Sequence, residues 1–348
     1  MLERVAYLNA GTDGPLPARA AAAAKGELER ELAEGRAQAH FERRGELNRR
    51  LRELYARALG GEPAEVALTT CTTEGMAQVI LGLGLGAGDE IVTSDEEHPG
   101  LLGALGAVQQ LRGVSVREVP LREVEAAVGP ATRLVACSHV GWVSGLFAPP
   151  ELGELDVPVL LDGAQGVGAI DVDVRALGCD AYAGAGQKWL CGPDGTGMLW
   201  VTPELQERLE VTRRGYGTLA DPNAGLDAQL QPDARRFDAA SLSAETVACS
   251  VAAAELLFEA GFEAVHARAV ALSAKLVEML RAAGREVAPR GPSTLVSFES
   301  PDPVAERARL AERGITIRNI PDRDWLRASV GAWNDEHDLE RLVEALST

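Results

Sequence analysis

The stretch that most constrains this chain runs from Val157 to Val201, where an apolar run of strand length leads into glycine-rich bends. Val159-Leu160-Leu161 stops at Asp162, and an apolar run bounded by turn residues is typical of a buried strand in a parallel sheet. Ligands of open α/β sheets bind just beyond the carboxyl ends of the strands. The sequence therefore predicts an α/β fold with Asp162 at a functional edge of the sheet.

Lys188 follows Gly184-Ala185-Gly186-Gln187, a segment too small and flexible to form an amphipathic element. A lysine is usually a solvated surface residue. The other two lysines of the chain, Lys25 and Lys275, fit that description because they lie in alanine- and glutamate-rich helical stretches, whereas Lys188 does not. A lysine on a glycine-rich bend and a carboxylate at a strand end are what pyridoxal 5'-phosphate needs. The lysine forms a Schiff base, and the acid keeps the pyridine nitrogen protonated.

The motifs DGAQ, GQKW and GPDGTG within this stretch resemble the cofactor-lysine region of class-V aminotransferases and cysteine desulfurases, which are fold-type-I pyridoxal phosphate enzymes. The resemblance implies a mixed, mostly parallel seven-stranded sheet in a large domain and a smaller α+β carboxyl-terminal domain. We expect an N-terminal active-site segment over residues 1–17, the large domain over 18–250 and the small domain over 251–348. Lys188 and Asp162 would be catalytic, and Gln187 would donate a hydrogen bond to the phosphate.

A second cofactor motif follows a short strand expected over residues 66–71. Thr72 or Thr73 is a suitable N-cap for a helix over 76–85, and free amide groups at a helix N-terminus bind anions. From the residues alone, capping without any ligand is an equally good reading. Because the phosphate-binding turn of the family reads much like CTTEG, the resemblance assigns Thr72 and Thr73 to the cofactor phosphate.

His98 and Trp142 follow two other expected strands, over 90–94 and 133–140. A lone histidine is more often structural, but the resemblance implies that His98 stacks on the pyridine ring and moves protons. Trp142 replaces an asparagine that many family members place near the cofactor O3'. It resembles instead the tryptophan of class-V carbon–sulfur lyases and isopenicillin-epimerase-like proteins, so we expect Trp142 at the substrate and Gln165 at O3'.

The segment RRFDAAS, from Arg235 to Ser241, resembles one that the family donates across a dimer interface. Family members are homodimers with shared active sites, so we expect a homodimer in which Ser241 reaches the phosphate of the partner subunit. Ser241 as the N-cap of a helix over 245–260 is an alternative that does not exclude the first role.

Composition and turn residues predict the other elements. One or two helices are expected over 18–59, a strand over 114–119, and a helix over 121–128. Helices over 245–283 lead to the small domain. Its expected strands span 294–298, 315–320 and 325–330, and its expected helices span 304–313 and 335–346.

Arg327 lies in the last of these strands and points away from the face that Leu326 and Ala328 share. An arginine on a strand is usually a solvated or paired surface charge. However, WLRASVGAWNDEHDLERLVEAL resembles the carboxyl-terminal motif of the family, whose arginine clamps the substrate α-carboxylate in a bidentate fork. The resemblance makes Arg327 the substrate anchor and Arg318, in GITIRNI, a second candidate.

Composition narrows the class of partner. The formal net charge of −18 disfavours nucleic acid and anionic membranes, since both need a basic face. The five cysteines are widely spaced and form no CxxC pair, so neither a disulfide framework nor a metal site is expected. No signal-peptide core or membrane-spanning run is expected either. We expect a cytoplasmic enzyme whose partner is a small amino acid substrate.

Desulfurases carry a nucleophilic cysteine between the strands that correspond to those of Arg318 and Arg327, whereas here the link from Asn319 to Asp324 is short and has no cysteine. The whole chain also resembles carbon–sulfur lyases most closely. The favoured hypothesis is β-elimination from a cysteine- or cystine-type amino acid. Transamination of a small amino acid is the second hypothesis, and epimerisation is the third. A different kind of hypothesis is a protein that binds the cofactor but catalyses no reaction. The presence of Lys188, Asp162 and Arg327 together argues against it.

Overall fold

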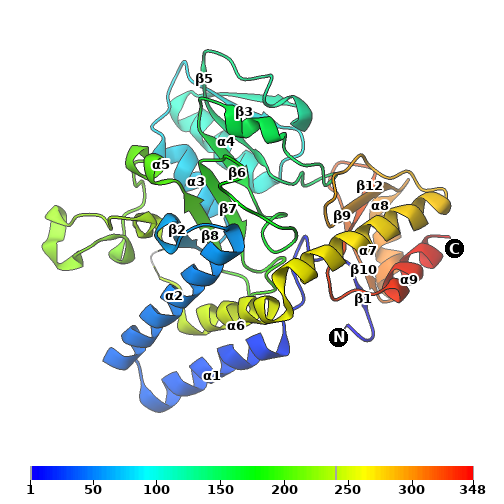
Figure 1. Ribbon diagram of the computed structural model, residues 1–348, viewed down its shortest axis with the longest axis horizontal. Coiled ribbons are helices and arrows are strands. Elements are labelled where there is room, and N and C mark those ends of the chain that lie inside the picture. Colours follow the sequence, from blue (N-terminus) through cyan, green and yellow to red (C-terminus); the bar gives the residue numbers. More distant parts are fainter. Residues whose placement is uncertain (1, 240, 348) are drawn as a thin grey trace.

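A mostly parallel sheet lies at the centre of the larger part of the molecule (Figure 1). The computed structural model describes residues 2–239 and 241–347, and within them this sheet has the order β2-β8-β7-β6-β5-β3-β4. β8 runs antiparallel to both of its neighbours, and the pairs among the other neighbouring strands are parallel. The expected fold class is thereby confirmed. The strands are β2 (Val66–Thr69), β3 (Glu90–Ser94), β4 (Ser115–Val119), β5 (Thr132–Ser138), β6 (Val159–Asp162), β7 (Ala181–Ala185) and β8 (Gly197–Val201).

The central strands are apolar because helices cover both faces of the sheet. Every residue of β6, β7 and β8 is buried, whereas the edge strand β4 contains only exposed and half-buried residues. α2 and α6 pack on one face, and α3 and α4 pack on the other. The helices of this part are α1 (Ala18–Glu34), α2 (Gln38–Leu59), α3 (Thr72–Gly82), α4 (Pro99–Arg112), α5 (Pro203–Arg208) and α6 (Ala244–Ala260).

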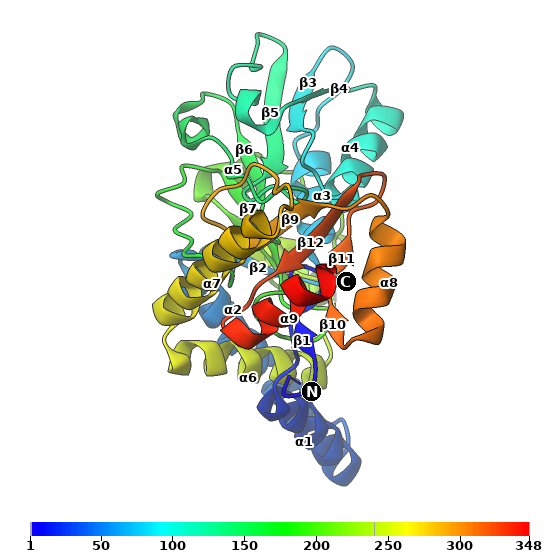
Figure 2. The same cartoon turned by 90° about the vertical axis from the view of Figure 1, so that its right-hand side faces the viewer.

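A smaller unit contains the carboxyl-terminal elements, and the long helix α7 connects α6 to it (Figure 2). Its antiparallel sheet has the order β11-β12-β9. The elements of this unit are α7 (Phe262–Ala282), β9 (Leu295–Glu299), α8 (Pro303–Glu312), β10 (Ile315–Thr316), β11 (Arg318–Asn319), β12 (Trp325–Ser329) and α9 (Glu336–Leu346). The exact domain boundaries that we expected stay a prediction.

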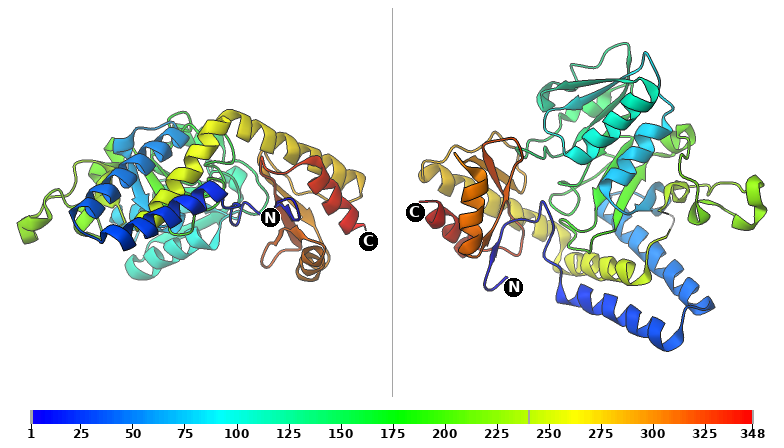
Figure 3. Two further views of the ribbon diagram at one scale, coloured as in Figure 1. Left: turned by 90° about the horizontal axis from the view of Figure 1, so that it is seen from below. Right: turned by 180° about the vertical axis from the view of Figure 1, so that it is seen from behind.

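The N-terminal segment joins the two parts of the molecule. β1 (Ala6–Tyr7) pairs in parallel with β10, so the N-terminus lies beside the smaller unit (Figure 3). Beyond β1 the chain returns to the larger part, where the amide of Gly14 donates to the carbonyl of Gln187 over 2.8 Å. The segment therefore contacts both the smaller unit and the loop of Lys188.

Several predicted elements differ from the structure. The helix expected over 121–128 is wrong: a short 3-10 turn, Leu121–Glu123, is followed by turns up to Gly129-Pro130, whose residues disfavour continuation of a helix. The strand expected over 315–320 is split into β10 and β11, which pair with different partners.

Two expected helix caps are also wrong. α3 begins at Thr72, so Thr72 and Thr73 lie in its first turn, and Cys71 is its N-cap residue without a side-chain hydrogen bond. α6 begins at Ala244 after Ser243, which removes the capping role considered for Ser241. Ala240 of the RRFDAAS segment lies outside the described residues. Across 2–239 and 241–347, no helix is long and apolar enough to cross a membrane.

Candidate active site

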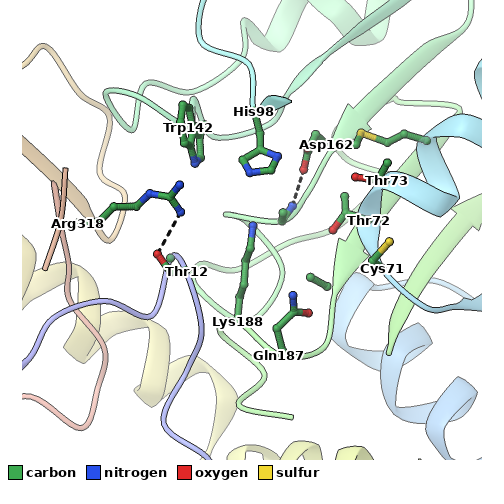
Figure 4. Close-up of a pocket in the computed structure, with 14 residues that line it drawn as sticks. Thr12, Cys71, Thr72, Thr73, His98, Trp142, Asp162, Gln187, Lys188 and Arg318 are labelled. Carbon is green, nitrogen blue, oxygen red and sulfur yellow. Dashed lines mark hydrogen bonds between the residues drawn. The ribbon is translucent and has the colours of Figure 1, made fainter. Parts of the chain in front are cut away.

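A cavity of about 210 Å³ opens at the carboxyl edge of the central sheet (Figure 4). Lys188 points into it between Arg318 on one side and the N-terminus of α3 on the other. Eight of the predicted site residues line the cavity: Thr72, Thr73, His98, Trp142, Asp162, Gln187, Lys188 and Arg318. The other residues that line it are Gly11, Thr12, Cys71, Met76, Ala164 and Ala185.

Lys188 is placed by the tight loop that follows β7. A Cβ on Gly186 would lie 2.4 Å from Oγ1 of Thr196, so only glycine fits where this loop folds back. Burial, with contributions from Arg327 and Arg318, lowers the pKa of Lys188 to about 8, and the charge of Asp162 opposes this effect. The amine therefore loses its proton more readily than an exposed lysine does.

Asp162 ends β6 and is 5% exposed. Its Oδ1 accepts a hydrogen bond from the amide of Ala164 over 2.9 Å. Burial raises the pKa of Asp162, and the charge of Lys188 lowers it. A buried carboxylate of this kind is stabilised by a cation, and a protonated pyridine nitrogen is such a cation.

The N-terminus of α3 is open toward the cavity. Because no side chain caps this helix, the amide groups of its first turn are available to an anion, and the helix dipole adds to the attraction. Thr72 and Thr73 add hydroxyl groups at the same place. Gln187 lies across the cavity, where its side-chain N–H groups can donate to an anion. This end of the cavity suits a phosphate group.

His98 and Trp142 form a wall of the cavity, with their ring centroids 5.2 Å apart in a T-shaped arrangement. Nδ1 of His98 accepts from the amide of Gly100 over 2.9 Å and so caps α4. Burial lowers the pKa of His98 to about 4, and the nearby charge of Lys188 lowers it further. The imidazole is therefore neutral at physiological pH, which suits it to pack against an aromatic ring.

Two guanidinium groups lie at the opposite end from α3. Arg318 lines the cavity and donates to Oγ1 of Thr12 over 3.3 Å. Arg327 is fully buried, donates from Nη1 to the carbonyl of Trp142, and keeps Nε and Nη2 without partners in the described chain. Neither guanidinium forms an ion pair with a carboxylate of residues 2–239 or 241–347. Arg327 therefore keeps hydrogen-bond donors available for an anion, whereas the charge of Arg318 is partly balanced by that of Asp13.

Three predicted site residues are not among those that line this cavity: the buried Arg327 behind it, Gln165 and Ser241. The amide group of Gln165 donates to the carbonyl of Gly11 over 2.8 Å and accepts from the indole N–H of Trp189 over 3.0 Å. It connects the N-terminal segment to the lysine loop, and this geometry gives no support to a contact with O3'. Ser241 lies in a separate hollow, 3.4 Å from Nη1 of Arg44.

The sequence did not single out Gly11 and Thr12, although both lie in the N-terminal active-site segment expected over residues 1–17. A Cβ on Gly11 would lie 2.6 Å from Oγ of Ser329 and 3.1 Å from Nη2 of Arg327. Glycine at this position therefore leaves room beside the guanidinium group. Only the pairing of β1 with the carboxyl-terminal unit brings this loop to the cavity, and that pairing has no local sequence signal.

Three features of the cavity fit pyridoxal phosphate. The open N-terminus of α3 matches the phosphate, the buried carboxylate of Asp162 matches the pyridine nitrogen, and Lys188 lies between them for the aldehyde carbon. The unpartnered Nε and Nη2 of Arg327 lie at the other end of the site. The cofactor and a substrate carboxylate can therefore be bound together.

Known proteins resemble this chain over nearly its whole length. The family model Aminotransferase class-V matches residues 6–342. Isopenicillin N epimerase of Streptomyces clavuligerus is 28% identical over 98% of this chain and 94% of its own length. A probable cysteine desulfurase of Aeropyrum pernix is 32% identical over 84% and 81% of the two chains. A solved complex between the cystine C–S lyase C-DES and its reaction product cysteine persulfide superposes with a TM-score of 0.94, at 28% identity over 99% and 98% of the two chains.

Proposed function

Because the chain belongs to the class-V aminotransferase family of pyridoxal-phosphate-dependent enzymes, we propose that it cleaves the carbon–sulfur bond of a cysteine- or cystine-type amino acid by β-elimination. With L-cystine and one water molecule, breaking the Cβ–S bond yields pyruvate, ammonia and cysteine persulfide. The observation that carries this proposal is the buried guanidinium group of Arg327, whose Nε and Nη2 have no partner in the described chain, together with Arg318 at the end of the cavity opposite the phosphate end (Figure 4). Bound pyridoxal phosphate supplies the electron sink for the charge that develops at the substrate Cα.

The residues around the cavity divide into two groups in this proposal. Thr72, Thr73 and Gln187 bind the cofactor phosphate, Asp162 binds the pyridine N–H, and His98 packs against the ring. Trp142 contacts the substrate and limits the entry of water, since the residue is 6% exposed and its ring packs against His98 in a T-shaped arrangement.

Lys188 is the proposed base of the reaction. Its Nζ is freed when the amino group of the substrate takes its place, and it then removes the proton from the substrate Cα. Because burial lowers the pKa of Lys188 to about 8, a useful fraction of the amine is neutral near physiological pH. Asp162 balances the positive charge that remains in the site.

Arg327 and Arg318 bind the anionic groups of the substrate. Arg327 is fully buried and offers two unpartnered N–H-bearing atoms, which fits the α-carboxylate held at a fixed distance from Lys188. Arg318 is half-buried at the wall of the cavity and contacts only the hydroxyl of Thr12 by hydrogen bonding. A second guanidinium group at the cavity favours an amino acid with two carboxylates, such as cystine, over one with a single carboxylate.

The cysteines favour elimination over persulfide transfer. The link between β11 and β12 contains no cysteine, and Cys137, Cys179, Cys191 and Cys249 are buried. Cys71 is partly exposed, but it precedes α3 at the phosphate end of the cavity, away from Arg318 (Figure 4). The sulfur released from the substrate would therefore leave with the product.

Epimerisation and transamination are the runner-up reactions. The match to isopenicillin N epimerase over nearly the whole chain favours epimerisation, and the family relationship favours transamination. All three reactions begin with removal of the Cα proton, so the same residues would serve each of them. They differ in the products that leave the enzyme.

Product analysis separates these reactions. The protein loaded with pyridoxal phosphate is incubated with L-cystine, and pyruvate and ammonia are measured, with Lys188→Ala as the control. Elimination predicts equal amounts of both products from the wild type and none from the variant. Absence of pyruvate would contradict elimination from cystine. Conversion of the cofactor to its pyridoxamine form would then support transamination.

We further propose a homodimer in the cytoplasm. The hollow around Ser241, with Phe41, Arg44 and Tyr216, lies on the surface of a single chain and is apolar enough to pack against a second copy. In such a dimer Ser241 would bind the phosphate in the partner subunit. A sedimentation measurement that finds only monomers at micromolar concentration would contradict the dimer.

A further inference from the structure

A buried glutamate lies directly before His98 and has no role in the reaction proposed above. Glu97 is 5% exposed, although it belongs to the short link between β3 and α4. Its side chain turns inward between the ends of two neighbouring strands of the central sheet. Burying a carboxyl group costs free energy unless hydrogen-bond donors surround it, so its presence here calls for a structural or functional explanation.

Three donors converge on this carboxyl group. The hydroxyl of Ser94, the last residue of β3, donates to Oε1. The amide of Ser138, the last residue of β5, donates to Oε1 over 2.9 Å, and its hydroxyl donates to Oε2 over 2.6 Å. Both oxygens accept, which is the pattern that stabilises a carboxylate anion. Glu97 therefore ties the chain next to His98 to the ends of β3 and β5.

The same carboxyl group is electrostatically coupled to the cofactor site. Ser138 pairs in register with Asp162 on β6, so the two acids lie at adjoining strand ends. The titratable groups that face Glu97 are Asp162 of β6 and Cys137 of β5, with His98 next to it in the chain, whereas β3 presents only the hydroxyl of Ser94. Burial, with a contribution from the charge of Asp162, raises the pKa of Glu97 to about 7 against these hydrogen bonds.

We propose that Glu97 is a positioning residue of the cofactor site, which holds the His98 segment against β5 and, in its ionised form, adds a negative charge near Asp162. This charge stabilises cationic, protonated groups in the site, because it attracts them at short range in a medium of low dielectric constant. Glu97 touches neither cofactor nor substrate in this proposal and acts through His98 and Asp162. The inference depends on the proposed binding of pyridoxal phosphate by Lys188, but not on which reaction follows.

The test is a pH titration of the visible absorbance of the bound cofactor in the wild type and in Glu97→Gln. Glutamine keeps an acceptor for the amide of Ser138, and the hydroxyl of Ser138 can turn to accept from the new amide, so the packing is retained. Loss of the negative charge makes protonation of the cofactor less favourable. The midpoint of the titration should fall by roughly half a pH unit to one pH unit.

Glu65→Gln is the matched control. Glu65 is 6% exposed, also accepts several hydrogen bonds, and lies at the start of β2, away from the residues that line the cavity. It should leave the midpoint unchanged. Ser138→Ala removes one donor from Glu97 and therefore disfavours its charged form, so it should shift the midpoint in the same direction by a smaller amount. This second variant keeps the test valid if Glu97→Gln does not fold.

Each outcome has one meaning. A lowered midpoint in Glu97→Gln but not in Glu65→Gln supports the proposal. Equal midpoints in the wild type and in Glu97→Gln overturn it, even if the variant is less stable. A wild-type protein that shows no cofactor absorbance refutes the proposed function, and this inference with it.

Discussion

Replacing Arg327 by methionine should make the ligand-free protein more stable while it removes activity. Arg327 is fully buried and has one acceptor, the carbonyl of Trp142. Burial, with a contribution from Arg318, lowers the pKa of Arg327 from 12.5 to about 9. At pH 7 this lowering corresponds to roughly 5 kcal/mol of unfavourable free energy in the folded state. Methionine has a similar length without the charge, but it leaves the carbonyl of Trp142 unpaired, which costs about 1–3 kcal/mol.

The free energy of unfolding should therefore rise by about 2 kcal/mol or more in Arg327→Met. Urea unfolding monitored by fluorescence and circular dichroism at pH 7.5 measures this difference. The sign of its pH dependence is fixed: the penalty is complete below the folded pKa of about 9 and fades as the pH rises toward 12.5. At pH 10.5 the gain should thus be smaller by roughly 2 kcal/mol. Arg318→Met is the control and should change stability much less, because Arg318 is half-buried.

Activity should change in the opposite direction. Loss of a buried, charged partner for the substrate carboxylate costs about 2–5 kcal/mol, which is a fall in kcat/KM of roughly 30- to 5000-fold. A variant that is both less active and less stable than the wild type by more than about 1 kcal/mol would refute the reasoning. So would a stability difference that is the same at pH 7.5 and pH 10.5.

Three further perturbations test other parts of the structure. Gly11→Ala places a Cβ 2.6 Å from Oγ of Ser329, so KM should rise about tenfold with little change in melting temperature; an unchanged KM would contradict the proposed carboxylate site. Burial lowers the pKa of His266 to about 4, so the stability that its neutral form provides is complete above pH 6.5 and is lost as the pH falls to 4. In His266→Gln the decline in urea midpoint over that range should be shallower, and an identical slope would count against this origin. Arg52→Ala should reduce the free energy of unfolding by about 3–5 kcal/mol, because it leaves Asp238 without the partner that holds both of its carboxylate oxygens; a loss below 1 kcal/mol would show that this pair contributes little.

The sequence predicted the sheet and the main chemical groups for a clear physical reason. Strands buried on both faces are nearly continuous apolar runs, so β6 could be recognised, and its end at Asp162 followed directly. Parallel strands bring their carboxyl ends to one edge, which is why Asp162 and Lys188 could be expected to meet there although they belong to different loops. The glycine-rich surroundings of Lys188 distinguished it from the two helical lysines.

Other parts of the site depended on contacts that have no local signal. The pairing of Ala6 with Ile315 joins distant parts of the chain through two-residue strands, too short to leave a pattern. The sequence could place the side chain of Gln165 near the site, but it could not predict which way its amide group points. That amide group is hydrogen-bonded to Gly11 and Trp189. A helix boundary shifted by a few residues changed Thr72 from a cap to a first-turn residue.

The central claim is that Lys188 carries the cofactor. Reduction of the protein loaded with pyridoxal phosphate by borohydride fixes the Schiff base as a stable secondary amine, and peptide mapping by mass spectrometry identifies the modified residue. Only three lysines compete, Lys25, Lys188 and Lys275, and the first and last lie on helices far along the chain from the glycine-rich loop. The structure predicts one phosphopyridoxyl group per chain, on Lys188. Modification of Lys25 or Lys275 instead, or none at all, would contradict the account.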